Sequence, residues 1–198
     1  MQIQPVTLEG AHVRLEPLHE THHAALCDIA FDPVLWRWTS VGLVTPDDVR
    51  AYIQNALKAQ AQGREQPFVT IEHDTGRVIG STRFLNMDQA NRRVEIGYTW
   101  IAQPWQRTLI NTEAKYLMLR YAFETFSLIR VELKTDALNA KSRAAIQRIG
   151  AKQEGILRKH IIVQQSGRIR DTVYFSILDS EWPHVKAELE RKLAISRP

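Results

Sequence analysis

Hydrophobic and polar positions alternate most clearly over residues 93–101, where every second residue is apolar or aromatic. A period of two is typical of a strand with one face in a core. It predicts Glu95 on the face opposite Val94, Ile96, Tyr98 and Trp100. After a polar loop at 102–111, apolar residues recur at spacings of three and four from Thr112 to Phe126. That spacing predicts a helix with one buried face, and therefore a strand–loop–helix segment.

The same patterns predict the other elements. Strands are predicted over 13–18, 67–72, 78–85, 130–135, 151–163 and 172–178, and helices over 21–31, 46–63, 139–148 and 180–195. Thr45 and Pro46 are typical of a helix start, and Gly150 of a helix end. Hairpins near the chain ends and strand–helix–strand crossovers in the middle predict an α+β fold. We expect one domain over 1–198, with a mixed, mostly antiparallel sheet flanked by helices.

Composition and charge narrow the function classes. The chain has 198 residues and a formal net charge of +4, with basic residues scattered apart from a short cluster at 158–160. Nucleic-acid binding needs a denser basic stripe, so no nucleic-acid partner is expected. No apolar run is long enough for a bilayer, and no membrane partner is expected. Cys27 is the single cysteine, and metal-binding spacings are missing from the sequence, so we expect no disulfide, no metal and a cytoplasmic protein.

The loop and helix start at 106–112 are the segment most suited to chemistry. A helix amino terminus has unpaired N–H groups and a partial positive charge, which suits a pyrophosphate. Candidate contacts are the main-chain groups and the Arg107 charge of this segment, made of Gln106, Arg107, Thr108, Leu109, Ile110, Asn111 and Thr112. An ordinary capped helix after an ordinary loop is the alternative.

The order of elements and four short motifs resemble the GNAT superfamily of N-acetyltransferases. The motifs are 14–18 (RLEPL), 95–98 (EIGY), 112–114 (TEA) and Asn139-x-x-Ser142 followed by Gly150-Ala151. Within that superfamily, the chain is most similar to the Rim-type ribosomal-protein N-terminal acetyltransferases. The resemblance implies a sheet splayed at an acetyl-CoA site. It also implies pantetheine contacts from Asn139 and from the main chain of Trp100 and Ile101.

The chain departs from the family's phosphate loop at two positions. The family has small residues where this chain has Leu109 and Asn111. Glycine lets a backbone approach a phosphate closely, so these larger residues keep open a catalytically weak acyl-CoA-binding or regulatory homologue. The expected activity is direct transfer of an acetyl group from acetyl-CoA to an amine, on a protein N-terminus or a small molecule.

Acetyl transfer needs a base for the amine and a proton for the departing thiolate. Glu95 is the candidate base, acting through water, and Glu132 on the next strand is its rival. Glu95 could instead be a surface carboxylate paired with Arg83 or Arg93. Many family members have a tyrosine that acts as the general acid, but this chain has Ile146 at that position, so Ser142 is the candidate proton donor. Tyr174 is a second candidate donor, and Asn139 could simply be a helix N-cap.

The tryptophans at 36 and 38 and the apolar stripe of the last predicted helix can each be interpreted in two ways. Trp36 and Trp38, with the cluster at 158–160, could form a wall of the acceptor pocket, or the tryptophans could belong to a buried cluster. The helix after 180 has a one-sided apolar stripe of Trp182, Val185, Leu189 and Leu193. This stripe must be covered by the domain itself or by a second subunit, so a homodimer is possible.

Overall fold

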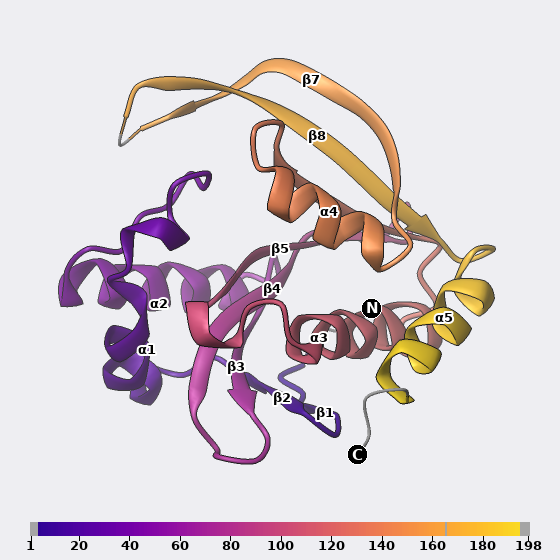
Figure 1. The fold of residues 1–198 in the computed structure, drawn as a ribbon, viewed down its shortest axis with the longest axis horizontal. Helices are drawn as coiled ribbons and strands as arrows, with labels where there is room; N and C mark the ends of the chain where they lie inside the picture. The colour runs from indigo at the N-terminus through magenta and orange to yellow at the C-terminus, as the bar shows by residue number, and fades with distance from the viewer. Residues whose placement is uncertain (1–3, 165, 195–198) are drawn as a thin grey trace.

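The computed structural model describes residues 4–164 and 166–194, and its centre is one eight-stranded sheet (Figure 1). The strands are β1 (Leu8–Glu9), β2 (Val13–Pro17), β3 (Gln66–Glu72), β4 (Val78–Asp88), β5 (Arg93–Ile101), β6 (Arg130–Asp136), β7 (Lys152–Val163) and β8 (Arg168–Leu178). Their order is β1-β2-β3-β4-β5-β6-β8-β7, and only β5 and β6 pair in parallel among the described strands. The predicted α+β fold with a mostly antiparallel sheet is confirmed.

In the described part of the chain, five α-helices cover this sheet (Figure 1). They are α1 (His23–Ala30), α2 (Pro46–Ala61), α3 (Leu109–Arg120), α4 (Ala140–Arg148) and α5 (Trp182–Ala194). The predicted end of the last helix, residue 195, lies outside the described residues. Within the described part of the chain, none of these helices has both the length and the apolar character needed to cross a membrane.

One helix boundary differs from its prediction in a way that affects the site. The predicted helix begins at Thr112, but α3 begins at Leu109, because Thr108 is its N-cap. The Thr108 hydroxyl accepts a hydrogen bond from the Ile110 N–H at 3.3 Å, which satisfies one free donor of the first turn. The residues assigned to the end of a loop are therefore the first turn of the helix.

The two faces of the sheet have separate cores. Phe68 and Val69, neighbours on β3, belong to different buried clusters, as expected for side chains on opposite faces of a strand. The first cluster includes buried residues of α3, α4 and α5, and we call this side the α3 face. The second includes buried residues of α1 and α2, and we call this side the α2 face.

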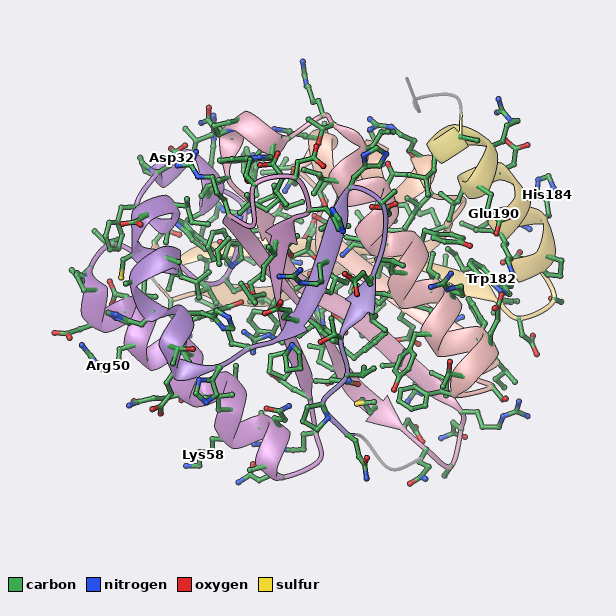
Figure 2. All side chains as sticks on the ribbon, turned by 90° about the horizontal axis from the view of Figure 1, so that it is seen from below. Asp32, Arg50, Lys58, Trp182, His184 and Glu190 are labelled. Atoms are coloured by element: carbon green, nitrogen blue, oxygen red, sulfur yellow. The ribbon has the colours of Figure 1, made fainter. Side chains whose placement is uncertain are left out.

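The apolar stripe of α5 packs into the core on the α3 face. Trp182, Val185 and Leu189 are buried there, and the Trp182 ring lies 5.4 Å from the ring of Phe123. Figure 2 shows Trp182 on the side of α5 turned toward the body of the protein, with His184 at the outer surface. The chain itself therefore covers most of the stripe, and the stripe gives no reason for a second subunit.

Candidate active site

The central feature of the site is a gap between β5 and β6. These strands pair only through Arg93–Arg130, Val94–Val131 and Glu95–Glu132. Beyond Glu95 the strands separate, while β5 stays paired with β4 as far as Ile101 and β6 stays paired with β8. The β6-facing edge of β5 therefore presents main-chain groups to the gap instead of to another strand. Trp100 and Ile101, the predicted pantetheine contacts, lie on this stretch.

A β-bulge lies on β5 at the gap. Ser81 of β4 pairs with Trp100 and Arg83 pairs with Gly97, so two residues of β5, Tyr98 and Thr99, oppose a single residue of β4. Tyr98 has a φ of 48°, in the left-handed region that non-glycine residues seldom adopt.

The bulge exchanges the two faces of the strand. Val94 and Ile96 belong to the core of the α3 face, whereas Trp100 lies on the α2 face, 5.2 Å from the ring of Trp36. The prediction that Trp100 shares a face with Val94 and Ile96 is therefore wrong, because an inserted residue shifts a period of two by one. Glu95 and Trp100 lie on the same face.

The second feature of the candidate site is the amino terminus of α3. Leu109 and Asn111 are not among the residues with positive φ, whereas Arg107 before them has a φ of 64°. The first turn of a helix leaves N–H groups without intrahelical partners, and Thr108 satisfies only that of Ile110. The larger residues of this loop therefore fit an ordinary helical turn, whose Leu109 and Asn111 N–H groups are not capped by Thr108.

The amino terminus of α4 lies next to this loop. The Gln106 side chain donates to the Ile101 carbonyl at 2.6 Å and accepts a hydrogen bond from Lys141 Nζ. Asn139 is the N-cap of α4, accepting from the Ser142 N–H at 3.0 Å, so the N-cap interpretation is confirmed.

Lys141 was not a candidate from the sequence. It lies in the first turn of α4. A cation there opposes the positive end of the helix dipole, so the helix itself gives no reason for a lysine at this position. Lys141 and the exposed Arg107 place two positive charges beside the amino terminus of α3.

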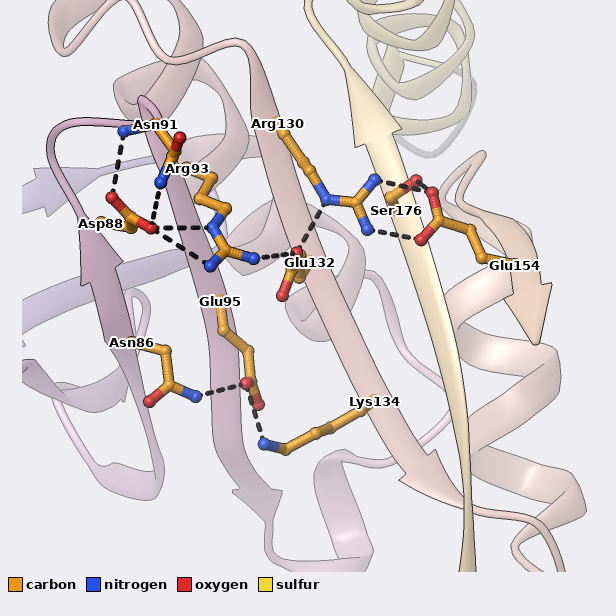
Figure 3. A network of polar contacts seen from close by, with 10 residues as sticks. All are labelled: Asn86, Asp88, Asn91, Arg93, Glu95, Arg130, Glu132, Lys134, Glu154 and Ser176. Carbon is orange, nitrogen blue, oxygen red and sulfur yellow. Dashed lines mark hydrogen bonds and ion pairs between the residues drawn. The ribbon is translucent and has the colours of Figure 1, made fainter. Parts of the chain in front are cut away.

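Glu95 is held on the α2 face, close to the point where the strands separate. Its carboxylate accepts from Asn86 Nδ2 at 2.8 Å and pairs with Lys134 Nζ at 2.9 Å, and its side chain is only 3% exposed (Figure 3). The expected alternative, a surface carboxylate paired with Arg83 or Arg93, does not hold. Arg83 pairs with Glu65 at 2.7 Å, and Arg93 pairs with Asp88 and Glu132.

Glu132, the rival base, belongs to a chain of ion pairs (Figure 3). Its carboxylate is 2.7 Å from Arg130 Nε and 3.4 Å from Arg93 Nη1. Arg130 also binds Glu154, which raises the pKa of Arg130 and lowers that of Glu154 to about 2. Both arginines contact the same Glu132 oxygen, Oε1. Glu132 is thus held by two guanidinium groups, whereas Glu95 is held by one ammonium group and one amide.

The candidate proton donors lie on different sides of the sheet. Ile146, at the family's tyrosine position, is buried in the core of the α3 face, and Ser142 lies half-buried one turn earlier on α4. Tyr174 on β8 pairs in register with Lys134, the partner of Glu95, and stacks edge-on against His160 at 5.9 Å. Tyr174 is therefore on the same side as Glu95, away from α4.

Trp36 and Trp38 lie in different surroundings. Trp36 packs in the α2-face cluster, and its indole N–H donates to the Ala30 carbonyl at 2.7 Å, which supports the buried-cluster interpretation. Trp38 is half-buried between two guanidinium groups, with Arg37 at 5.0 Å and Arg168 at 5.3 Å from its ring. The 158–160 cluster is exposed on β7. Trp38 is thus the tryptophan that contacts the β7–β8 hairpin, through Arg168 of β8.

Comparisons with known proteins agree with this geometry. The acetyltransferase (GNAT) domain family matches residues 12–152. A Bacillus subtilis (strain 168) protein named "Putative ribosomal N-acetyltransferase YdaF" is 41% identical over 107 residues, which span 54% of this chain and 57% of that relative. A GCN5-related N-acetyltransferase from Brucella melitensis superposes with a TM-score of 0.89 at 31% identity, over 96% of this chain and 86% of that one. Mycobacterium smegmatis RimJ, solved in complex with CoA-disulfide, superposes with a TM-score of 0.83 at 25% identity, over 98% of this chain and 96% of that one. The predicted resemblance, including that to the Rim-type branch, is confirmed, and the chain belongs to the GNAT acetyltransferase family.

Proposed function

We propose that this chain transfers the acetyl group of acetyl-CoA directly to an amine, without an acetylated enzyme intermediate. The observation that carries the proposal is the gap between β5 and β6, where a strand edge and two helix amino termini meet. An extended pantetheine arm can pair with the free edge of β5 as an added strand would. The pyrophosphate then lies at the start of α3, where N–H groups and positive charge favour an anion.

The residues at the phosphate end fit this cofactor. Arg107 and Lys141 supply charge, and the N–H groups of Leu109 and Asn111 supply main-chain donors. Asn139 already uses its side-chain oxygen as an N-cap, so its amide nitrogen is the group offered to the pantetheine. When bound, acetyl-CoA supplies the activated carbonyl, and the protein supplies orientation and proton handling.

Glu95 is proposed as the base that removes a proton from the acceptor amine through water. It lies on the α2 face, opposite the helices that flank the phosphate end, so acceptor and cofactor reach the gap from two sides. Lys134 and Asn86 hold its carboxylate in place. With an exposed fraction of 3%, Glu95 meets the acceptor through a water molecule and not directly.

The acceptor proposed is the α-amine of a protein N-terminus. An α-amine has a pKa of about 7.7–8.0, compared with about 10.4 for a lysine, so a far larger fraction is already neutral at pH 7. A carboxylate that acts through a water molecule is a strong enough base to remove the proton from such an α-amine. The name of YdaF, a putative ribosomal N-acetyltransferase, supports an acceptor on a protein, which is said of YdaF and proposed for this chain.

The proposal is tested first by titration calorimetry and then by turnover. We expect saturable acetyl-CoA binding at about one per chain. Peptides with a free N-terminus should release CoA and gain an acetyl group by mass spectrometry. Control peptides with a blocked N-terminus, whose only amine is an internal lysine, should release no CoA and gain no acetyl group. A chain that gives neither heat nor a higher melting temperature with acetyl-CoA would contradict the proposal.

The base assignment is tested by Glu95→Gln, which keeps the shape and removes proton acceptance. Loss of general-base help should lower turnover by about 100- to 10,000-fold, and the defect should shrink as pH rises and more amine is neutral. Glu132→Gln is the matched control on the adjacent strand, and its effect should fall mainly on stability. Normal turnover in Glu95→Gln with a loss in Glu132→Gln would move the base to Glu132.

A further inference from the structure

A buried lysine lies beneath the gap. Lys115, in the second turn of α3, is 5% exposed, and its Nζ donates to Thr99 Oγ1 at 2.6 Å and to Thr82 Oγ1 at 3.2 Å. Both contacts are neutral hydroxyls, so no carboxylate offsets the charge of the amine. Burial alone lowers the pKa of Lys115 from 10.5 to about 7.

The charged groups on the surrounding elements are engaged elsewhere. Glu113 on the same helix accepts from the main-chain N–H groups of residues 11–13. On the elements around α3, the charged groups form pairs of their own. The pairs are Glu9 of β1 with His73, Arg14 with Glu16 within β2, Arg83 of β4 with Glu65 just before β3, Glu95 of β5 with Lys134 of β6, Glu124 with Lys186 of α5, and Glu190 of α5 with Tyr116. Among the described residues, Lys115 is thus surrounded by hydroxyls and apolar side chains.

One of the two threonines that Lys115 contacts lies on the unpaired stretch of β5 and is exposed. Thr99 is one of the two bulged residues of β5, four positions beyond the last β5–β6 pair, and its side chain is exposed. Thr82, the second partner of Lys115, is 1% exposed and lies on the neighbouring strand β4. The Thr82 and Thr99 hydroxyls also share a hydrogen bond of 2.7 Å, so the amine and the two hydroxyls form one cluster. Thr99 therefore joins a buried titratable amine to the place where the thioester would lie.

We propose that Thr99 is the proton donor to the departing CoA thiolate, and that Lys115 is the positioning residue that returns the proton to Thr99. This inference rests on the proposed acetyl transfer. The acceptor nitrogen attacks the thioester carbon, the C–S bond breaks, and the electron pair stays on sulfur. The Thr99 hydroxyl proton moves to sulfur to give the thiol, and a proton moves from Lys115 Nζ to Thr99 Oγ1. Lys115 takes a proton from water after CoA leaves, while the surplus proton of the acceptor leaves through Glu95.

The acidities fit this direction of transfer. An ordinary thiol has a pKa of about 8.5, so a lysine at its usual pKa of about 10.4 is too weak an acid to protonate the thiolate. With a pKa of about 7, Lys115 is the stronger acid of the pair, so proton transfer to sulfur is downhill. Desolvation of a lysine is thus what makes it useful near neutral pH.

Thr99 has an advantage over Ser142 as the donor. The polar contact of Ser142 is its main-chain N–H on Asn139. Of the two hydroxyls, Thr99 is the one in contact with a buried amine. Ile146 is apolar and buried in the core, so it cannot donate a proton. The donor must therefore come from another element, and in this proposal it is Thr99 of β5.

The test compares wild type with Lys115→Met and Thr99→Val, which keep size and remove the amine or the hydroxyl. Turnover is measured with saturating acetyl-CoA and peptide from pH 6 to pH 9. We expect both variants to be slower by about 100-fold at the acidic end, the lower limit for loss of a general acid. The wild-type to variant ratio should fall as pH rises through the Lys115 pKa and approach one at the alkaline end, because wild-type Lys115 has then lost its proton too. Lys58→Met, which removes an exposed lysine from α2, is the control and should keep the turnover of wild type at every pH.

A second measurement does not depend on activity. In NMR titrations of the ligand-free protein with labelled lysine, one side-chain resonance should titrate near pH 7 and be missing in Lys115→Met. A rate ratio that stays constant with pH, or a Lys115 resonance that titrates near the usual value, would overturn the relay. Absence of turnover in wild type with every amine would instead overturn the proposed function, and the relay with it. The two failures are thus distinct.

Discussion

Replacing Lys115 with methionine should remove a pH-dependent destabilisation from the folded protein. Burial lowers the Lys115 pKa from 10.5 to about 7. Between these two values the unfolded chain holds a proton that the folded chain does not, so the free energy of unfolding rises with pH across that window. Below pH 7 both states are protonated, and the folded state bears the full cost of a buried ammonium.

The size of this effect follows from the shift of about 3.5 pKa units, from 10.5 to about 7. At about 1.36 kcal/mol per unit, the buried charge costs about 5 kcal/mol at and below pH 7. Above that pH the free energy of unfolding should rise by about 1.4 kcal/mol per pH unit from this group, or about 2.7 kcal/mol over two units. Methionine is apolar and of similar length, so the variant lacks this contribution and should be the more stable protein at neutral pH.

Urea denaturation at several pH values measures the difference. The quantity of interest is the free energy of unfolding of Lys115→Met minus that of wild type, in which the titration of all other groups cancels. It should fall by about 2.7 kcal/mol between pH 7.5 and pH 9.5, which is about 1 M in urea midpoint. Lys58→Met removes an exposed lysine from the outer side of α2, as Figure 2 shows, and should follow wild type at every pH. A Lys115→Met difference that does not change with pH would refute the argument that Lys115 is buried without a compensating charge.

Two further predictions concern Glu113, which ties α3 to the start of β2, and Lys141, in the first turn of α4. Glu113→Gln should lower the free energy of unfolding by about 1–3 kcal/mol in urea denaturation, because the buried carboxylate accepts three main-chain N–H groups and an amide supplies only one acceptor oxygen. An unchanged midpoint would contradict that role. Lys141→Ala should raise the Kd for acetyl-CoA in calorimetry several-fold while turnover at saturation stays within about twofold, since a phosphate contact binds ground state and transition state alike. Equal affinity for wild type and variant would show that Lys141 does not contact the cofactor.

The sequence predicted elements with strong local signals to within a few residues. β5 occupies the predicted 93–101, and α2 begins at Pro46 after a capping box made by Thr45 and Asp48. Both rest on neighbours in sequence: a period of two in the first case, and a cap with its reciprocal carboxylate in the second. β1 was missed because two residues are too short to show any period.

The parts of the site that were missed depend on contacts between distant residues. Lys115 lies one position from Ala114, on a helix whose pattern predicts a single buried face. In the structure eight residues of α3 are buried, because the sheet, β1–β2 and α5 enclose the helix on several sides. A polar residue beside the apolar stripe is normally solvated, and only the neighbours of the helix show that Lys115 is not. Lys141 had a local signal, a cation in a first helical turn, which a check against the helix dipole would have found.

The bulge at Tyr98 connects the two halves of the proposed chemistry. In a regular strand, Glu95 and Thr99 are four residues apart and share a face. The extra residue in β5 instead leaves Glu95 with Lys134 on the α2 face and turns Thr99 toward Lys115 on the α3 face. Acetyl transfer removes a proton at nitrogen and delivers one at sulfur, and these atoms lie on different sides of the same carbonyl carbon. We infer that the bulge is what allows one strand to supply a base to one side of the thioester and an acid to the other. The left-handed backbone conformation of Tyr98 is strained for a tyrosine. We infer that this strain is the cost of placing Glu95 and Thr99 on opposite faces of β5.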